Sequence, residues 1–134
     1  MFQVNVNFLA VIVAAIANMA LGFLWYSQAL FANAWMAAIG KTREQLGQPG
    51  PAYALTLVGA LVTAYILALF VKVAQAQTLL DGALTGLLAA VGFVATSFGV
   101  GYIFEGRPRN LYLINVGYQL VSLVVMGAIL GVWR

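Results

Sequence analysis

Four long apolar stretches without a charged residue dominate the pattern of this chain. They run over residues 8–28, 51–71, 82–104 and 110–133. About 20 apolar residues in an α-helix span the hydrocarbon core of a bilayer, and each stretch reaches this length. The pattern therefore predicts an all-α protein, a four-helix transmembrane bundle that forms one integral membrane domain over residues 1–134. No Lys or Arg precedes the first stretch, so we do not expect a cleaved signal peptide.

The connection between the first and second stretches is the longest, and it carries a helical pattern of its own. Apolar residues recur there at roughly helical spacing, namely Leu30, Phe31, Trp35, Met36 and Ile39. This predicts a short interfacial helix over residues 30–40, with Trp35 at the depth of the lipid headgroups. Thr42 followed by Gln45 is a capping-box pattern, which predicts a second short turn that stops at Gly47.

The basic residues of the short connections predict an orientation. The connections after the first and third stretches hold Lys41, Arg43, Arg107 and Arg109, whereas the opposite side holds Lys72 and Arg134. Basic residues in short loops favour the cytoplasmic side of a membrane. We therefore expect both termini on the non-cytoplasmic side.

Composition supports the membrane class and removes several functions. Hydrophobic residues make up 64% of the chain, charged residues 7%, and the mean hydropathy is +1.01. The absence of Cys and His removes the thiolate and imidazole groups that most catalytic, haem and metal sites use. The six basic residues are scattered, so no nucleic-acid partner is expected. We expect no enzyme, no cofactor and no metal site.

Polar side chains inside the stretches predict a polar seam through the bundle. In the fourth stretch Asn115, Tyr118, Gln119 and Ser122 share one helical face. With alternating helix directions, that face lies at the depth of further polar residues, which are Asn18, Thr63, Thr96 and Ser97. Uncharged polar groups in lipid need partners, so the face should point at protein. We favour interhelical hydrogen bonding as its role, and a small-molecule pocket or pathway and an oligomer interface are the alternatives.

The acidic residues lie near the ends of the stretches. Asp81 precedes the third stretch, where a carboxylate suits the positive end of a helix. Glu105 is followed closely by Arg107 and Arg109, and an interfacial ion pair that closes this turn is the expected role of the cluster. The alternative is that the two arginines hold an anion, such as a lipid headgroup or a substrate.

Glycines and aromatic residues complete the pattern. Gly82 with Gly86, and Gly127 with Gly131, form small-xxx-small pairs, which permit close packing of the third and fourth stretches or dimerisation. Small residues appear on more faces than one bundle needs, so we expect a homo-oligomer, with a dimer favoured. An aromatic belt at the membrane interfaces accounts for Trp25, Tyr26, Trp35, Tyr53, Tyr112 and Trp133.

Short motifs at both ends of the chain resemble a known family. The first group is Asn7-Phe8-Leu9-Ala10-Val11, Leu21-Gly22-Phe23-Leu24-Trp25-Tyr26 and Trp35; the second is Phe104-Glu105-Gly106-Arg107, Leu111-Tyr112-Leu113-Ile114-Asn115, Gly117-Tyr118 and Leu130-Gly131-Val132-Trp133. Together they resemble the bacterial membrane family catalogued as domain of unknown function seventeen sixty-one. The resemblance implies about four helices and no activity, and it transfers no catalytic or binding residue.

The function expected from these observations is of an accessory, binding or structural type. Such a protein would act in the bacterial inner membrane through helix–helix association with itself or with another membrane protein, among membrane lipids. The alternative is a small oligomeric transporter or channel for a neutral solute or a lipid. No stretch carries an ionisable Asp, Glu, Lys, Arg or His, which disfavours proton or ion coupling.

Overall fold

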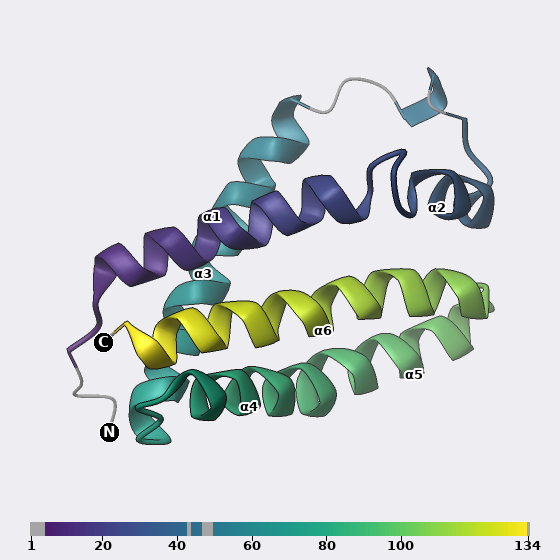
Figure 1. Cartoon of the computed structure of the whole chain (residues 1–134). Coiled ribbons are helices and arrows are strands. Elements are labelled where there is room, and N and C mark those ends of the chain that lie inside the picture. The colour runs from purple at the N-terminus through teal and green to yellow at the C-terminus, as the bar shows by residue number, and fades with distance from the viewer. Residues whose placement is uncertain (1–4, 43, 47–49, 134) are drawn as a thin grey trace.

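The structure is a computed structural model that describes residues 5–42, 44–46 and 50–133. Its elements in chain order are α1 (Phe8–Trp25), α2 (Ala32–Ile39), the 3₁₀ turn η1 (Glu44–Leu46), α3 (Gly50–Val73), α4 (Leu79–Ala89), the π-helical segment η2 (Ala90–Ala95), α5 (Thr96–Glu105) and α6 (Arg109–Val132). α4, η2 and α5 follow one another without a break and form one long rod (Figure 1). Across the described residues, four helical segments are long and apolar enough to cross a membrane, and none of these residues forms a strand. The prediction of an all-α, four-span protein is confirmed.

The first span ends earlier than its apolar pattern predicts. Asn7 caps α1, because its side-chain oxygen accepts the backbone N–H of Leu9 at 3.1 Å. α1 stops at Trp25, whereas the apolar stretch continues to residue 28. Ser27 donates its hydroxyl to the carbonyl of Leu24 at 2.6 Å, and such local side-chain bonds compete with a continuing helix.

The third span begins earlier than predicted, at Leu79 instead of residue 82. Thr78 is the reason, because its hydroxyl oxygen accepts the N–H of Asp81 at 3.0 Å and caps the helix. Asp81 then lies in the first turn of α4, where its carboxylate is close to the positive end of the helix.

The connection between α1 and α3 contains the predicted short helix, α2. After it, the side-chain oxygen of Gln45 accepts the backbone N–H of Thr42 at 2.8 Å, which is one of the two bonds of a capping box. The predicted stop at Gly47, and the basic residues Arg43 and Arg134, lie outside the described residues.

α6 is the central helix of the bundle. It runs antiparallel to both α1 and the α4–η2–α5 rod, and it contacts α1, α2, α3, α4, η2 and α5 (Figure 1). α1 ends beside α2, where α5 ends and α6 begins; we call this the α2 end of the bundle. The opposite end, where α1 begins and α6 ends, is the terminal end.

α3 differs from the other long helices because its buried residues begin only at Ala60. Before that point the ring of Tyr53 packs edge-on against Phe23 of α1, with the ring centres 5.4 Å apart. α3 crosses α1 and α6 at a steep angle (Figure 1). Its second half buries Ala60, Ala64 and Leu67 among others, whereas every residue of 50–59 is exposed. We call residues 50–59 the α3 arm. The buried half shares a core of small residues with α1, including Ala10 and Ala14, toward the terminal end.

The closest packing in the bundle joins α4 to α6. A Cβ placed on Gly82 would lie 2.0 Å from the carbonyl oxygen of Gly127, and one on Gly86 would lie 2.0 Å from that of Leu123. A Cβ on Gly131 would lie 2.5 Å from the carbonyl oxygen of Thr78. The two backbones therefore touch, and all four glycines of the small-xxx-small pairs are used inside one chain. Of the two roles predicted for these pairs, packing of the third span on the fourth is the one observed.

Candidate intramembrane binding cavity

A cavity of about 940 Å³ lies between the α3 arm and the helices α1 and α6. It exists because α3 diverges from its neighbours while its second half stays packed. Trp35 of α2 and Leu46 of η1 line it toward the α2 end, and Thr63 and Met126 line it deeper in the bundle. Ligand sites in proteins commonly enclose about 300–1,000 Å³, so the cavity has the size of one.

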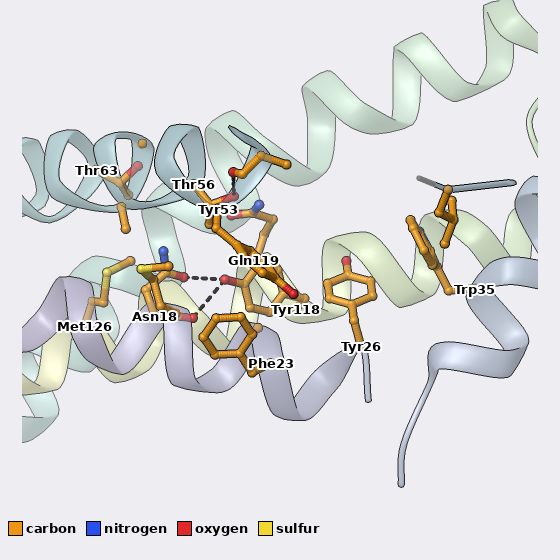
Figure 2. Close-up of a pocket in the computed structure, with 16 residues that line it drawn as sticks. Asn18, Phe23, Tyr26, Trp35, Tyr53, Thr56, Thr63, Tyr118, Gln119 and Met126 are labelled. Carbon is orange, nitrogen blue, oxygen red and sulfur yellow. Dashed lines mark hydrogen bonds between the residues drawn. The ribbon is translucent and has the colours of Figure 1, made fainter. Parts of the chain in front are cut away.

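One wall of the cavity is fixed by a hydrogen-bonded cluster of α1 and α6. The side-chain oxygen of Asn18 accepts the hydroxyl of Tyr118 at 2.7 Å and also that of Ser122. The backbone carbonyl of Asn18 is a second acceptor for Tyr118, at 2.9 Å (Figure 2). Ser122 is fully buried, so its hydroxyl depends on this acceptor. These three residues of the predicted seam are brought together.

Gln119 and Thr63 lie on the same cavity but outside the cluster. Both line its walls, Gln119 from α6 and Thr63 from α3. Figure 2 shows the Gln119 amide extending toward the α3 arm near Thr56. Within the described part of the chain, neither side chain makes a hydrogen bond to another residue. Their polar groups are therefore available to an occupant of the cavity.

Thr96 and Ser97 do not join the seam, and their assignment to it is wrong. Both are exposed, and Thr96 donates its hydroxyl to the carbonyl of Gly92 in its own rod at 2.7 Å. The prediction rested on the depth of these residues in the membrane, which does not show the face of the helix on which they lie. The π-helical segment η2 precedes them, and its wider turn rotates the residues that follow it to another face.

Asn115, the remaining member of the seam, binds two tyrosines at the α2 end. Its side-chain oxygen accepts the hydroxyl of Tyr26 at 2.7 Å, and its side-chain nitrogen donates to the hydroxyl of Tyr102 at 2.8 Å. This network ties α1 and α5 to α6. Tyr26 also lines the cavity, so the network forms the margin of the cavity at this end.

Three of the residues predicted to form the aromatic belt also make hydrogen bonds between elements of the bundle. Trp25 donates its indole N–H to the carbonyl of Ile114 at 2.9 Å, and Tyr112 donates its hydroxyl to the carbonyl of Ala95 in η2 at 2.8 Å. With Tyr26, three of the belt residues therefore hold helices together. The indole N–H and phenol O–H groups could have suggested these bonds, because a Trp or Tyr at the end of a span can also reach a neighbouring helix.

The charged turn between α5 and α6 lies apart from the cavity. Arg107 and Glu105 form an ion pair of 3.8 Å between exposed side chains, as predicted for this turn. The guanidinium of Arg107 also stacks over the ring of Tyr102, at 4.3 Å from its centre. Arg109 begins α6 and is exposed. An exposed ion pair contributes little stability, so the turn is held mainly by its helix ends.

The chemistry of the cavity wall is neutral. Its lining residues include Asn18, Gln119, Thr56 and Thr63 and several aromatic rings, and no Asp, Glu, Lys or Arg among the residues that the structure describes lines it. Over the described ranges, no three His, Cys, Asp or Glu residues come close enough to hold a metal ion. The site can therefore donate and accept hydrogen bonds within a mostly apolar surface.

Fold and cavity define a class: a small helical protein with four membrane-span helices and a neutral polar cavity between three of them. Residues 9–131 match the family described as "Protein of unknown function (DUF1761)". The match covers nearly the whole chain, and the protein belongs to this family. Neither a curated protein nor a solved structure matches the chain.

Proposed function

We propose that the protein binds an uncharged amphiphile of the membrane in the cavity between α1, α3 and α6. The observation that carries this proposal is a cavity of about 940 Å³ whose wall combines amides and hydroxyls with aromatic and Met side chains. Such groups are not expected to stay unpaired in lipid, because each polar group without a hydrogen-bond partner there raises the free energy of the protein. An amphiphile supplies both a polar partner and an apolar surface.

The described part of the wall carries no charged side chain, and this supports an uncharged ligand. A carboxylate or phosphate in a site of low dielectric needs a cationic partner, since its desolvation costs more than neutral donors return. The basic residues of the described chain that lie nearest the α2 end, Lys41, Arg107 and Arg109, do not line the cavity. Phe23, Trp35 and Tyr53 instead offer flat apolar surfaces to a lipid chain or ring.

The shape of the cavity favours binding over passage. Beyond Ala60 and Thr63, one helical turn deeper, Ala64 is fully buried against α1, where Ala14 is also fully buried. This core of small residues packs α3 against α1 on the terminal side of the cavity. A transporter or channel for a neutral solute or lipid, the alternative function, would require this core to open or a second subunit to supply the path.

We also propose that the protein associates with itself or with another membrane protein. Fewer residues support this than the sequence suggested. The glycines of α4 and α6 are used within one chain. Gly59 lines the cavity, so the surface left for a second copy is the other side of the α3 arm, where Leu55 and Val58 are exposed and do not line the cavity. We also expect no catalytic activity, since the cavity offers neither a general acid–base pair nor an activated nucleophile.

Binding can be measured through the fluorescence of Trp35, which lines the cavity. The probe is a monoacylglycerol whose chain carries two bromine atoms, and the full chain is embedded in nanodiscs of saturated phosphatidylcholine. Bromine quenches tryptophan only on close approach. We expect quenching that saturates at low mole fraction of the probe, because a defined site fills.

The Trp35→Phe variant is the control, since the exposed Trp133 remains to report on bulk lipid. It should lose the saturable part of the quenching and retain a part that grows steadily with probe. A brominated phosphatidylcholine should give only the steady part. Quenching by the monoacylglycerol that never saturates, or that is the same in Trp35→Phe, would contradict the proposed function.

We further propose that the protein resides in the bacterial inner membrane with both termini on the non-cytoplasmic side. Lys41, Arg107 and Arg109 all lie at the α2 end, where basic residues favour the cytoplasm. A periplasm-dependent reporter fused after Arg134 is expected to be active, and the same reporter inserted after Lys41 to be inactive. The opposite pair of results would reverse the orientation.

A further inference from the structure

The side-chain amide of Asn18 turns its oxygen toward α6 and its nitrogen toward the cavity. Its oxygen accepts the hydroxyls of Tyr118 and Ser122, and a carbonyl oxygen has two lone pairs for such bonds. The nitrogen of the same amide is therefore turned away from α6. Figure 2 shows it directed across the cavity toward Thr63 of α3.

In this orientation the side-chain N–H groups of Asn18 face the cavity without a hydrogen-bond acceptor. The amide nitrogen carries two N–H groups, and in the described chain no other residue accepts them. The oxygen of Asn18 is already occupied, so the amide presents donors and no free acceptor. An occupant that brings an oxygen acceptor without a proton of its own matches this side chain best.

We infer that the cavity recognises the acyl carbonyl of an uncharged lipid, whose oxygen accepts from the side-chain nitrogen of Asn18. This inference rests on the proposed function and names the chemical group that the site selects. A hydroxyl in the same place could accept from Asn18, but its own proton would need an acceptor that this amide does not offer. A carboxylate would be charged, and none of the described residues that line the wall is cationic.

Gln119 completes the recognition from the next turn of the same wall. Its amide extends toward the α3 arm, and it can turn to donate or to accept. It therefore suits the hydroxyl or second oxygen that accompanies the carbonyl in an acylglycerol. Asn18 therefore binds the carbonyl oxygen, and Gln119 binds the hydroxyl or second oxygen of the polar head.

The test compares two lipids that differ only at the carbonyl. Mono-oleoylglycerol, an ester, and its oleyl ether analogue are each used to displace the brominated monoacylglycerol from the wild-type chain in nanodiscs, with Trp35 fluorescence as the readout. We expect the ester to displace the probe at about fivefold lower concentration, because one neutral hydrogen bond is gained. Equal displacement by ester and ether would overturn the inference while leaving the proposed function intact.

Two variants assign the preference to its residue. Asn18→Leu should bring ester and ether to within about twofold of each other, because both N–H donors are lost. Thr96→Val, which makes an equally small change at an exposed position outside the cavity, should retain the ester preference. A preference that survives Asn18→Leu would also overturn the inference. Failure of the brominated probe to bind the wild-type chain at all would instead remove the proposed function and this inference together.

Discussion

A leucine at Gly86 is expected to separate α4 from α6 and to destabilise the bundle by at least about 3 kcal/mol. A Cβ at this position would lie 2.0 Å from the carbonyl oxygen of Leu123 and 2.7 Å from its carbonyl carbon. These are backbone atoms, so no change of rotamer can relieve the contact. The whole helix must move away, and the neighbouring contact of Gly82 with Gly127 is lost with it.

Unfolding of the full chain in mixed micelles, followed by circular dichroism as the fraction of denaturing detergent rises, measures this effect. Gly101→Leu is the matched control, because it makes the same change within a helix and nothing lies within 4 Å of a Cβ there. We expect its stability to stay within about 0.5 kcal/mol of the wild type. Equal stability of Gly86→Leu and Gly101→Leu would show that α4 and α6 do not meet as described.

The Gly59→Leu variant is expected to keep the fold and to lose binding of the ligand, in contrast to Gly86→Leu. Gly59 lines the cavity, and a Cβ there meets nothing within 4 Å. A leucine side chain can therefore grow into the cavity without moving a helix. We expect the half-saturating fraction of the brominated monoacylglycerol to rise at least about tenfold, since apolar bulk replaces the ligand and 1.4 kcal/mol corresponds to this factor.

Trp35 quenching measures the loss, and unfolding in mixed micelles shows that Gly59→Leu remains folded. Gly101→Leu is again the control, because its glycine lies on α5 outside the cavity and should bind the probe like the wild type. Unchanged half-saturation in Gly59→Leu would place the bound probe elsewhere on the protein.

The spans were predictable because the bilayer sets their length and excludes charge from them. Their ends were predicted less well, since these depend on single side chains that bond to the backbone. Ser27 shortens α1, and Thr78 lengthens α4. The apolar pattern shows neither effect, although both residue types are known to form such bonds.

The polar cluster was predictable in part. The helical spacing of Tyr118 and Ser122 placed both on one face of the last span, and Asn18 was expected at the same depth. Thr96 and Ser97 were misplaced because periodicity carries no sign of the π-helical turn that precedes them. The angle at which α3 crosses its neighbours, and hence the cavity, depends on which small residues meet between helices, and a single sequence does not specify those pairings.

The central position of α6 also sets the order in which the bundle can assemble. α6 is the last of the described helices to be synthesised. Its Tyr118 and Ser122 donate their hydroxyls to Asn18, and its backbone contacts α4. Until α6 inserts, the Asn18 amide of α1 faces lipid or translocon without these partners. The chain therefore acquires its cavity in a single late step, when α6 inserts. An arrested chain that lacks α6 displays the unpaired amide of Asn18 in the membrane. This amide distinguishes an incomplete chain from a complete one.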